Sequence, residues 1–186
     1  MKLARWGITV AAITIGALAS SGAFAATVQQ YTFTGRGTAV TAALTFDGIG
    51  NALYLEGSVV TSIAQSFTLR GVGQFNTGST FCTVTRLDGS TEPGINLVFV
   101  RSKTVILDAN AGAIFERGSY GSGCTGSDGA FSINETDLVT GGTGIYKNAF
   151  GSVTFSESGI TLAAPSSGSG IFNFFRAKGS VSITLP

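Results

Sequence analysis

The feature that most constrains the fold is a succession of short β-prone runs separated by turn formers. Stretches such as ALYLEGSVVTS, INLVFVR and AFGSVTFSE are rich in β-branched and aromatic residues, and helix signals are almost absent after residue 25. Turn formers, among them Asp88-Gly89-Ser90 and Asp128-Gly129, separate the runs at intervals of about 8 to 14 residues. The pattern predicts an all-β meander, either closed as a barrel or stacked as a sandwich.

Some of these runs are apolar on both faces. In residues 95–101, one face carries Ile95, Leu97 and Phe99 while the other carries Val98 and Val100. In a sheet with one solvent-exposed face, polar and apolar residues would alternate more regularly. We therefore expect these strands either to be covered on both sides, by a filled or lipid-like interior and by a partner subunit, or to contact a membrane. An outer-membrane barrel is disfavoured because Gly and Thr interrupt most strands.

The N-terminal segment has the pattern of a secretory signal peptide. Lys2 and Arg5 precede an apolar run over residues 6–18, and small residues end in Ala23-Phe24-Ala25. The alternative, a membrane anchor, would need an apolar run of about 20 residues. We therefore expect cleavage after residue 25, a secreted protein (periplasmic or extracellular), and a single β-domain over residues 26–186 without a membrane span.

Charge and residue usage limit the partners. The chain has 11 Lys and Arg against 10 Asp and Glu, and loss of Lys2 and Arg5 would leave nine against ten. The chain lacks the excess of positive charge that would attract nucleic acid. Charged residues make up only 11% of the chain while Gly alone contributes 27 residues. We expect a hydroxyl-rich exterior that tolerates self-association.

Cys82 and Cys124 are the only cysteines. On a secretory route two thiols usually pair, so a disulfide is expected, with two separate buried thiols as the alternative. The chain has no histidine, which removes the commonest metal ligand and the usual base for a Ser or Cys nucleophile. We expect no metal, no cofactor and no hydrolase activity.

Charged residues on otherwise apolar strand faces are the candidate ligand-binding residues. Each of them either ends its strand in solvent or reaches the mouth of a cavity, where it would orient the polar end of an apolar ligand. They are Glu56, Arg101, Glu157 and Arg176, together with Tyr54, which shares a face with Glu56; Arg101 continues the face of Phe99 and Glu157 that of Phe155. The other acids are scattered, and Asp47, Asp88 and Asp128 are explained as solvated turn residues. Residues 118–129, GSYGSGCTGSDG, are expected to form a flexible loop.

The glycine run TGGTGIYKNAFGSVTF, residues 140–155, first suggests a phosphate-binding loop. It matches neither the Walker pattern nor the dinucleotide fingerprint, and a strand rather than a helix follows it. We expect residues 131–138 and 149–157 to be strands joined by a tight hairpin turn, with glycines supplying positive φ.

This hairpin resembles that of the dirigent and allene oxide cyclase-like superfamily. The matching positions are Gly141, Gly142, Thr143, Gly144, Tyr146, Ala149 and Gly151. They cover about a tenth of the chain. The resemblance implies an antiparallel up-and-down, calycin-like barrel of about eight strands around an elongated apolar cavity, commonly trimeric. Tyr146 is interpreted as a packing residue beside the turn.

Three functions remain open. The first is a secreted, non-hydrolytic barrel that binds a small apolar molecule in its lumen, as a homo-oligomer. The second is a structural or surface self-association protein without a pocket. The third, by analogy with the family, is an allene oxide cyclase-like isomerase or cyclase acting by substrate confinement. A lumen plugged by Phe99, Phe115, Phe155 and Phe174 would contradict the ligand-binding hypothesis.

Overall fold

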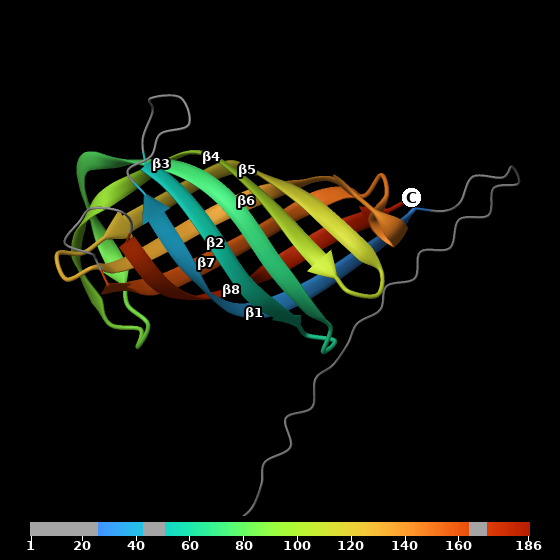
Figure 1. Ribbon diagram of the computed structural model, residues 1–186, viewed down its shortest axis with the longest axis horizontal. Helices are drawn as coiled ribbons and strands as arrows, with labels where there is room; N and C mark the ends of the chain where they lie inside the picture. Colours follow the sequence, from blue (N-terminus) through green and yellow to red (C-terminus); the bar gives the residue numbers. More distant parts are fainter. Residues whose placement is uncertain (1–25, 43–50, 164–170) are drawn as a thin grey trace, which may run out of the picture.

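The computed structural model describes residues 26–42, 51–163 and 171–186 (Figure 1). The strands are β1 Thr27–Ala42, β2 Asn51–Thr61, β3 Ser66–Thr85, β4 Thr91–Asp108, β5 Gly112–Thr125, β6 Ala130–Gly142, β7 Phe150–Ala163 and β8 Ile171–Leu185. The expected signal peptide and Asp47 lie outside the described residues.

The eight strands form one antiparallel sheet that closes on itself. Each strand pairs with the next along the chain, and β8 pairs with β1 from Thr27 opposite Leu185 to Thr41 opposite Ile171. The expectation of an all-β antiparallel fold is confirmed. Because the ring passes through every described strand, these strands do not divide into the two separate sheets of a sandwich.

One register shift decides which side chains face inward. Phe75 on β3 lies opposite Phe99, but the preceding residue, Gln74, lies opposite Arg101, so Val100 is an extra residue on β4. The bulge interrupts the alternation, and Arg101 is exposed while Ser102 faces the interior. The expectation that Arg101 continues the face of Phe99 is therefore wrong.

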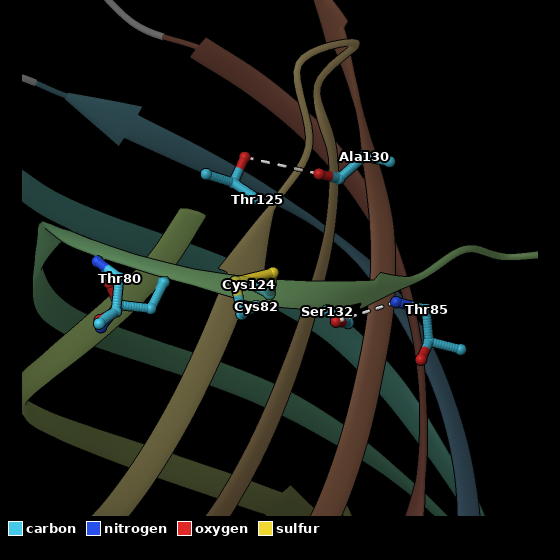
Figure 2. The surroundings of a disulfide bond; sticks show 8 residues. Thr80, Cys82, Thr85, Cys124, Thr125, Ala130 and Ser132 are labelled. Atoms are coloured by element: carbon cyan, nitrogen blue, oxygen red, sulfur yellow. Dashed lines mark hydrogen bonds between the residues drawn. A yellow bond between two sulfur atoms is a disulfide. The ribbon is translucent and has the colours of Figure 1, made fainter. Parts of the chain in front are cut away.

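The tip formed by the end of β3 and the start of β4 is fastened to β5 and β6. The predicted disulfide is present: Cys82 on β3 bonds Cys124 on β5, with their Cα atoms 6.0 Å apart. Figure 2 shows this bond beside a second link, in which the backbone N–H of Thr85 donates to Ser132 Oγ over 3.2 Å. Gly94 of β4 passes close by, where a Cβ would lie 2.8 Å from the Cys124 sulfur.

Strand β5 corrects the expectation of a flexible loop over residues 118–129. It runs without interruption to Thr125, and only the residues after it form a turn. Its glycines are needed for close packing. A Cβ on Gly123 would lie 3.0 Å from both Leu97 and Phe99, so the absence of a side chain makes room for these residues.

The glycine run between β6 and β7 forms a loop that is wider than the expected tight hairpin turn. Strands flank it as expected, but residues 143–149 form a wider connection that contains the short 3-10 helix η1, Gly144–Tyr146. Positive φ is confirmed at Gly141 (134°) and Gly144 (60°). Gly142 is not among the residues with positive φ, and its close approach to Tyr146 instead excludes a side chain.

This loop packs one end of the ring. Thr143 exchanges hydrogen bonds with Ala113, its N–H donating over 2.8 Å and its hydroxyl accepting over 3.0 Å. Tyr146 is buried and donates its hydroxyl to Asp108 Oδ2 over 3.0 Å. A buried cluster gathers around it: Ile114, Val139, Ala149, Val153 and Ile183. Tyr146 is thus a packing residue, as the sequence indicated.

Candidate functional site

The ring encloses a cavity of about 630 Å³. All eight strands contribute to its wall, because alternate residues point inward wherever a strand is regular. The wall is mainly apolar. Phenylalanines from six strands line it, namely Phe33, Phe67, Phe75, Phe99, Phe131, Phe155 and Phe175. The lumen is open despite Phe99 and Phe155 in its wall, and Phe115 and Phe174 are not among the lining residues.

Four carboxyl groups interrupt this apolar wall on three adjacent strands. They are Glu116 on β5, Glu135 and Asp137 on β6, and Glu157 on β7. The register places them in a diagonal band. Gly118 lies opposite Asp137, and Glu116 is two residues before it on β5; Phe155 lies opposite Glu135, and Glu157 is two residues after it on β7. All four face the cavity.

These acids are withdrawn from solvent. Glu116 is 5% exposed and Asp137 2%, and Glu135 is buried as well. Glu157 retains some accessible surface because it faces the cavity. Ser102 Oγ donates a hydrogen bond to Glu135 Oε1 over 2.8 Å. By contrast, Glu116 Oε1 and Asp137 Oδ1 have no hydrogen-bond partner in the described part of the chain.

No described cation balances the band. The ion pairs of the described residues join Glu56 to Arg70 and Arg86 to Glu92 and Asp128, all away from the four acids. Arg36 borders the cavity, but its side chain is exposed and its register partner is Arg176 on the outer face. The wall therefore presents acids without an opposite charge.

This environment raises the pKa of each acid. Burial raises the pKa of Glu116 well above its usual range, and the charges of Asp137 and Glu135 raise it further. Burial, with a contribution from Glu135, raises the pKa of Glu157 to about 8 and that of Asp137 to about 8. Burial also raises the pKa of Glu135, although hydrogen bonds from Ser102 and Asp137 offset part of the effect. At neutral pH Asp137 and Glu157 are therefore mostly protonated.

Glycine makes room for the band. A Cβ on Gly118 would lie 2.5 Å from Glu135 Oε1 and would also overlap Ser102 Oγ, and a Cβ on Gly121 would lie 3.1 Å from Glu135 Cγ. The glycines of β5 thus leave the space that the Glu135 carboxyl occupies.

The chain was compared with known proteins. No family model, curated protein or solved structure matches it. Among the described residues, no helix is long and apolar enough to cross a membrane. The same part of the chain contains no group of three or more His, Cys, Asp or Glu side chains arranged to hold a metal ion.

Of the five ligand-binding candidates from the sequence, only Glu157 lines the cavity. Its predicted face is correct, since Val153 and Phe155 line the cavity with it. Tyr54 and Glu56 do share a face, but it is the outer one. Tyr54 is 50% exposed there, and Glu56 forms an exposed ion pair with Arg70 at 3.0 Å.

The two arginine candidates also lie outside the cavity. Arg101 faces outward after the bulge and is bonded to Gln74. Arg176 is exposed, and its guanidinium carbon lies 6.0 Å from the centroid of the Phe174 ring. No ligand-orienting Arg–Glu pair forms at the cavity from these five residues, because four of them point away from it.

Sequence reasoning missed three of the four acids. Their signal was present: Ile133, Glu135, Asp137 and Val139 occupy alternate positions of one strand, so two acids share the face of two buried aliphatic residues. Glu116 likewise follows Ile114 on the same face of β5. An acid among apolar residues on the inward face of a strand is therefore the sequence pattern that indicates such a buried carboxyl group.

Proposed function

We propose that the closed ring is an up-and-down, calycin-like β-barrel of the dirigent and allene oxide cyclase-like type, and that it binds a small apolar molecule in its lumen. The observation that carries the proposal is the cavity of about 630 Å³ with phenylalanines in its wall, since ligand pockets typically measure about 300–1,000 Å³. The lack of histidine supports a non-hydrolytic role. The signal-like N-terminus and the disulfide support secretion.

The test uses a neutral fluorescent apolar probe, N-phenyl-1-naphthylamine, whose emission rises when it leaves water. We expect saturable binding with one probe per chain, abolished or strongly weakened by Leu55→Trp, which places a larger side chain in the lumen. Tyr54→Trp is the matched control, because it adds the same indole to the adjacent, outward-facing position. Equal binding by both variants, with circular dichroism showing both folded, would contradict a lumenal site.

Self-association is the second proposed property. An apolar row crosses four strands on the outer face, where Phe172, Val40, Tyr54 and Val72 are successive register partners, although Val72 also borders the cavity. Three of these side chains are substantially exposed: Phe172 and Tyr54 at 50% and Val72 at 41%. A homo-oligomer, with the trimer that the resemblance implies, would cover this row. Native mass spectrometry tests it, and a monomer at all concentrations would contradict it.

A confinement-type isomerase or cyclase would use the same lumen. Asp137 hydrogen-bonds Glu135, so one carboxyl of this pair is able to donate a proton and the other to accept one. The proposal of an enzyme nevertheless rests on the family resemblance, and lumenal binding is the function that the geometry supports best.

A further inference from the structure

We infer that the ligand of the lumen is an apolar amine, whose hydrocarbon body lies against the phenylalanines and whose protonated nitrogen lies at the band that Glu116, Asp137, Glu135 and Glu157 form along the wall. The inference rests on the proposed lumenal binding and specifies its chemistry. Four acids on one side of a mainly apolar cavity distinguish this lumen from one that selects hydrocarbons by shape alone.

The unpartnered oxygens provide the first argument. Glu116 Oε1 and Asp137 Oδ1 are buried without a hydrogen bond, although both residues are more than nine-tenths buried. Buried polar groups in proteins are almost always hydrogen-bonded, to protein, water or ligand. A protonated primary amine carries three donors, which suits the unpartnered acceptors on the adjacent strands β5 and β6.

Charge provides the second argument. The four acids have no described cationic partner, and an ionised carboxylate in an apolar cavity is strongly unfavourable without one. An ammonium group would supply that partner inside the cavity. A fatty acid would add another negative group, and an alcohol would add a single donor without charge. The wall therefore favours the amine over both molecules of the same length.

Proton linkage follows from the same groups. Burial keeps Asp137 and Glu157 largely protonated at neutral pH, with pKa values of about 8. A bound cation favours the ionised carboxyls, so amine binding releases protons, and affinity rises with pH until the amine itself loses its proton near pH ~10.4, as a lysine amine does.

The other titratable side chains at the cavity do not alter this direction. Burial raises the pKa of Tyr31, and burial with the bond to Asp108 raises that of Tyr146 to about 12, so both stay neutral across the relevant range. Arg36 borders the cavity but points outward. Within the described part of β2, β3, β4 and β8, the lining contains no titratable side chain.

The experiment compares three ligands of equal chain length, decylamine, decanol and decanoate, as competitors for bound N-phenyl-1-naphthylamine. At about pH 8.5 we expect decylamine to bind about tenfold more tightly than decanol, with decanoate weakest, since hydrogen bonds to charged groups are the stronger ones. Between about pH 6 and 8.5 the decylamine affinity should rise while that of decanol changes little. Titration calorimetry in two buffers of different ionisation enthalpy should show proton release on amine binding only.

Isosteric variants connect the preference to the acids. Glu116→Gln and Glu157→Gln should each reduce the ratio of decylamine to decanol affinity while decanol binding is retained. Glu56→Gln, on the outer face, should leave the ratio unchanged. Decanol binding as tightly as decylamine, or an unchanged ratio in both variants, would overturn the amine inference and leave lumenal binding intact. Failure of all three ligands and of the probe would instead overturn the proposed function.

Discussion

Ser102 and Glu135 lie on strands that are not neighbours, β4 and β6, yet the serine hydroxyl donates to the glutamate over 2.8 Å because glycine occupies the strand between them. This hydrogen bond lowers the pKa of Glu135, whereas burial raises that pKa by a larger amount. It depends on the bulge at Val100, which turns Ser102 inward.

Ser102→Ala should therefore raise the pKa of Glu135 and reduce the free energy of unfolding by about 1 kcal/mol, the usual net value of one hydrogen bond. Carbon-detected NMR titration of the carboxyl groups would measure the pKa, and urea unfolding would measure stability. Ser122→Ala, at an exposed position of β5, is the control. A Glu135 pKa that does not change would show that the bond is absent in solution.

The unliganded protein should lose stability as pH rises from about 5 to 9. Asp137 and Glu157 have folded-state pKa values of about 8, above their unfolded values, so the folded protein binds more protons in this window and the free energy of unfolding falls with pH. Thermal unfolding across the range measures the slope. Glu157→Gln should flatten it, and a stability that is constant or increases toward pH 9 would contradict burial of these acids.

Gly118→Ala should disturb the band directly. Its Cβ would meet Glu135 Oε1 at 2.5 Å and would overlap Ser102 Oγ, so we expect a loss of about 1–3 kcal/mol together with weaker amine binding. Gly73→Ala is the matched control: Gly73 also lines the cavity, but the nearest atom to its added Cβ is 3.6 Å away. Equal stability of the two variants by urea unfolding would show that Gly118 is not crowded.

Gly144→Val should destabilise the loop that packs the end of the ring. Gly144 has φ of 60°, and a Cβ there would collide with the backbone of Ala111. We expect a loss of about 2 kcal/mol or more. Gly141→Ala separates the two causes, because Gly141 also has positive φ but has no atom near the added Cβ. A melting temperature of Gly144→Val equal to that of the unmodified protein would contradict the loop geometry.

Removal of the disulfide should lower stability by up to about 4 kcal/mol, the chain-entropy value for a closed loop of this size. Cys82 and Cys124 are separated by 42 positions in the sequence. Urea unfolding of a Cys82→Ser, Cys124→Ser double variant, beside the reduced and the oxidised protein, measures the loss. Identical midpoints for the three forms would indicate that the cysteines are not bonded in the purified protein.

Much of the fold follows from periodicity. Alternation assigned the inward face of Val153, Phe155 and Glu157 correctly, and turn formers separated the strands. Arg101 shows the limit of that reasoning: a single extra residue at Val100 reversed its face, and no local sequence signal marks the bulge. The long β5 was missed because its glycines are typical of loops, whereas here they accommodate side chains from neighbouring strands.

The candidate site was harder to predict than the fold. Glu56 and Arg176 were expected at strand ends or at the mouth of a cavity, but they lie within β2 and β8, on the outer face. The four acids of the band lie among inward-facing residues within their strands, and their arrangement as a band depends on the register between β5, β6 and β7. Alternation along one strand predicts that Glu135 and Asp137 share a face, but it does not predict that Glu116 and Glu157 lie on the strands beside them.

The pairing of β1 with β8 has a consequence for how copies of this protein meet. In the middle of the ring each described strand is hydrogen-bonded on both sides, whereas residues 27–32 of β1 have described register partners on β8 alone and residues 81–85 of β3 on β4 alone. Beyond the ring, the β3–β4 tip is held against β5 and β6 by the disulfide and the Thr85 bond. Strand addition from another chain would therefore be confined to these ends of β1 and β3, because a ladder in the middle of the ring would first have to open.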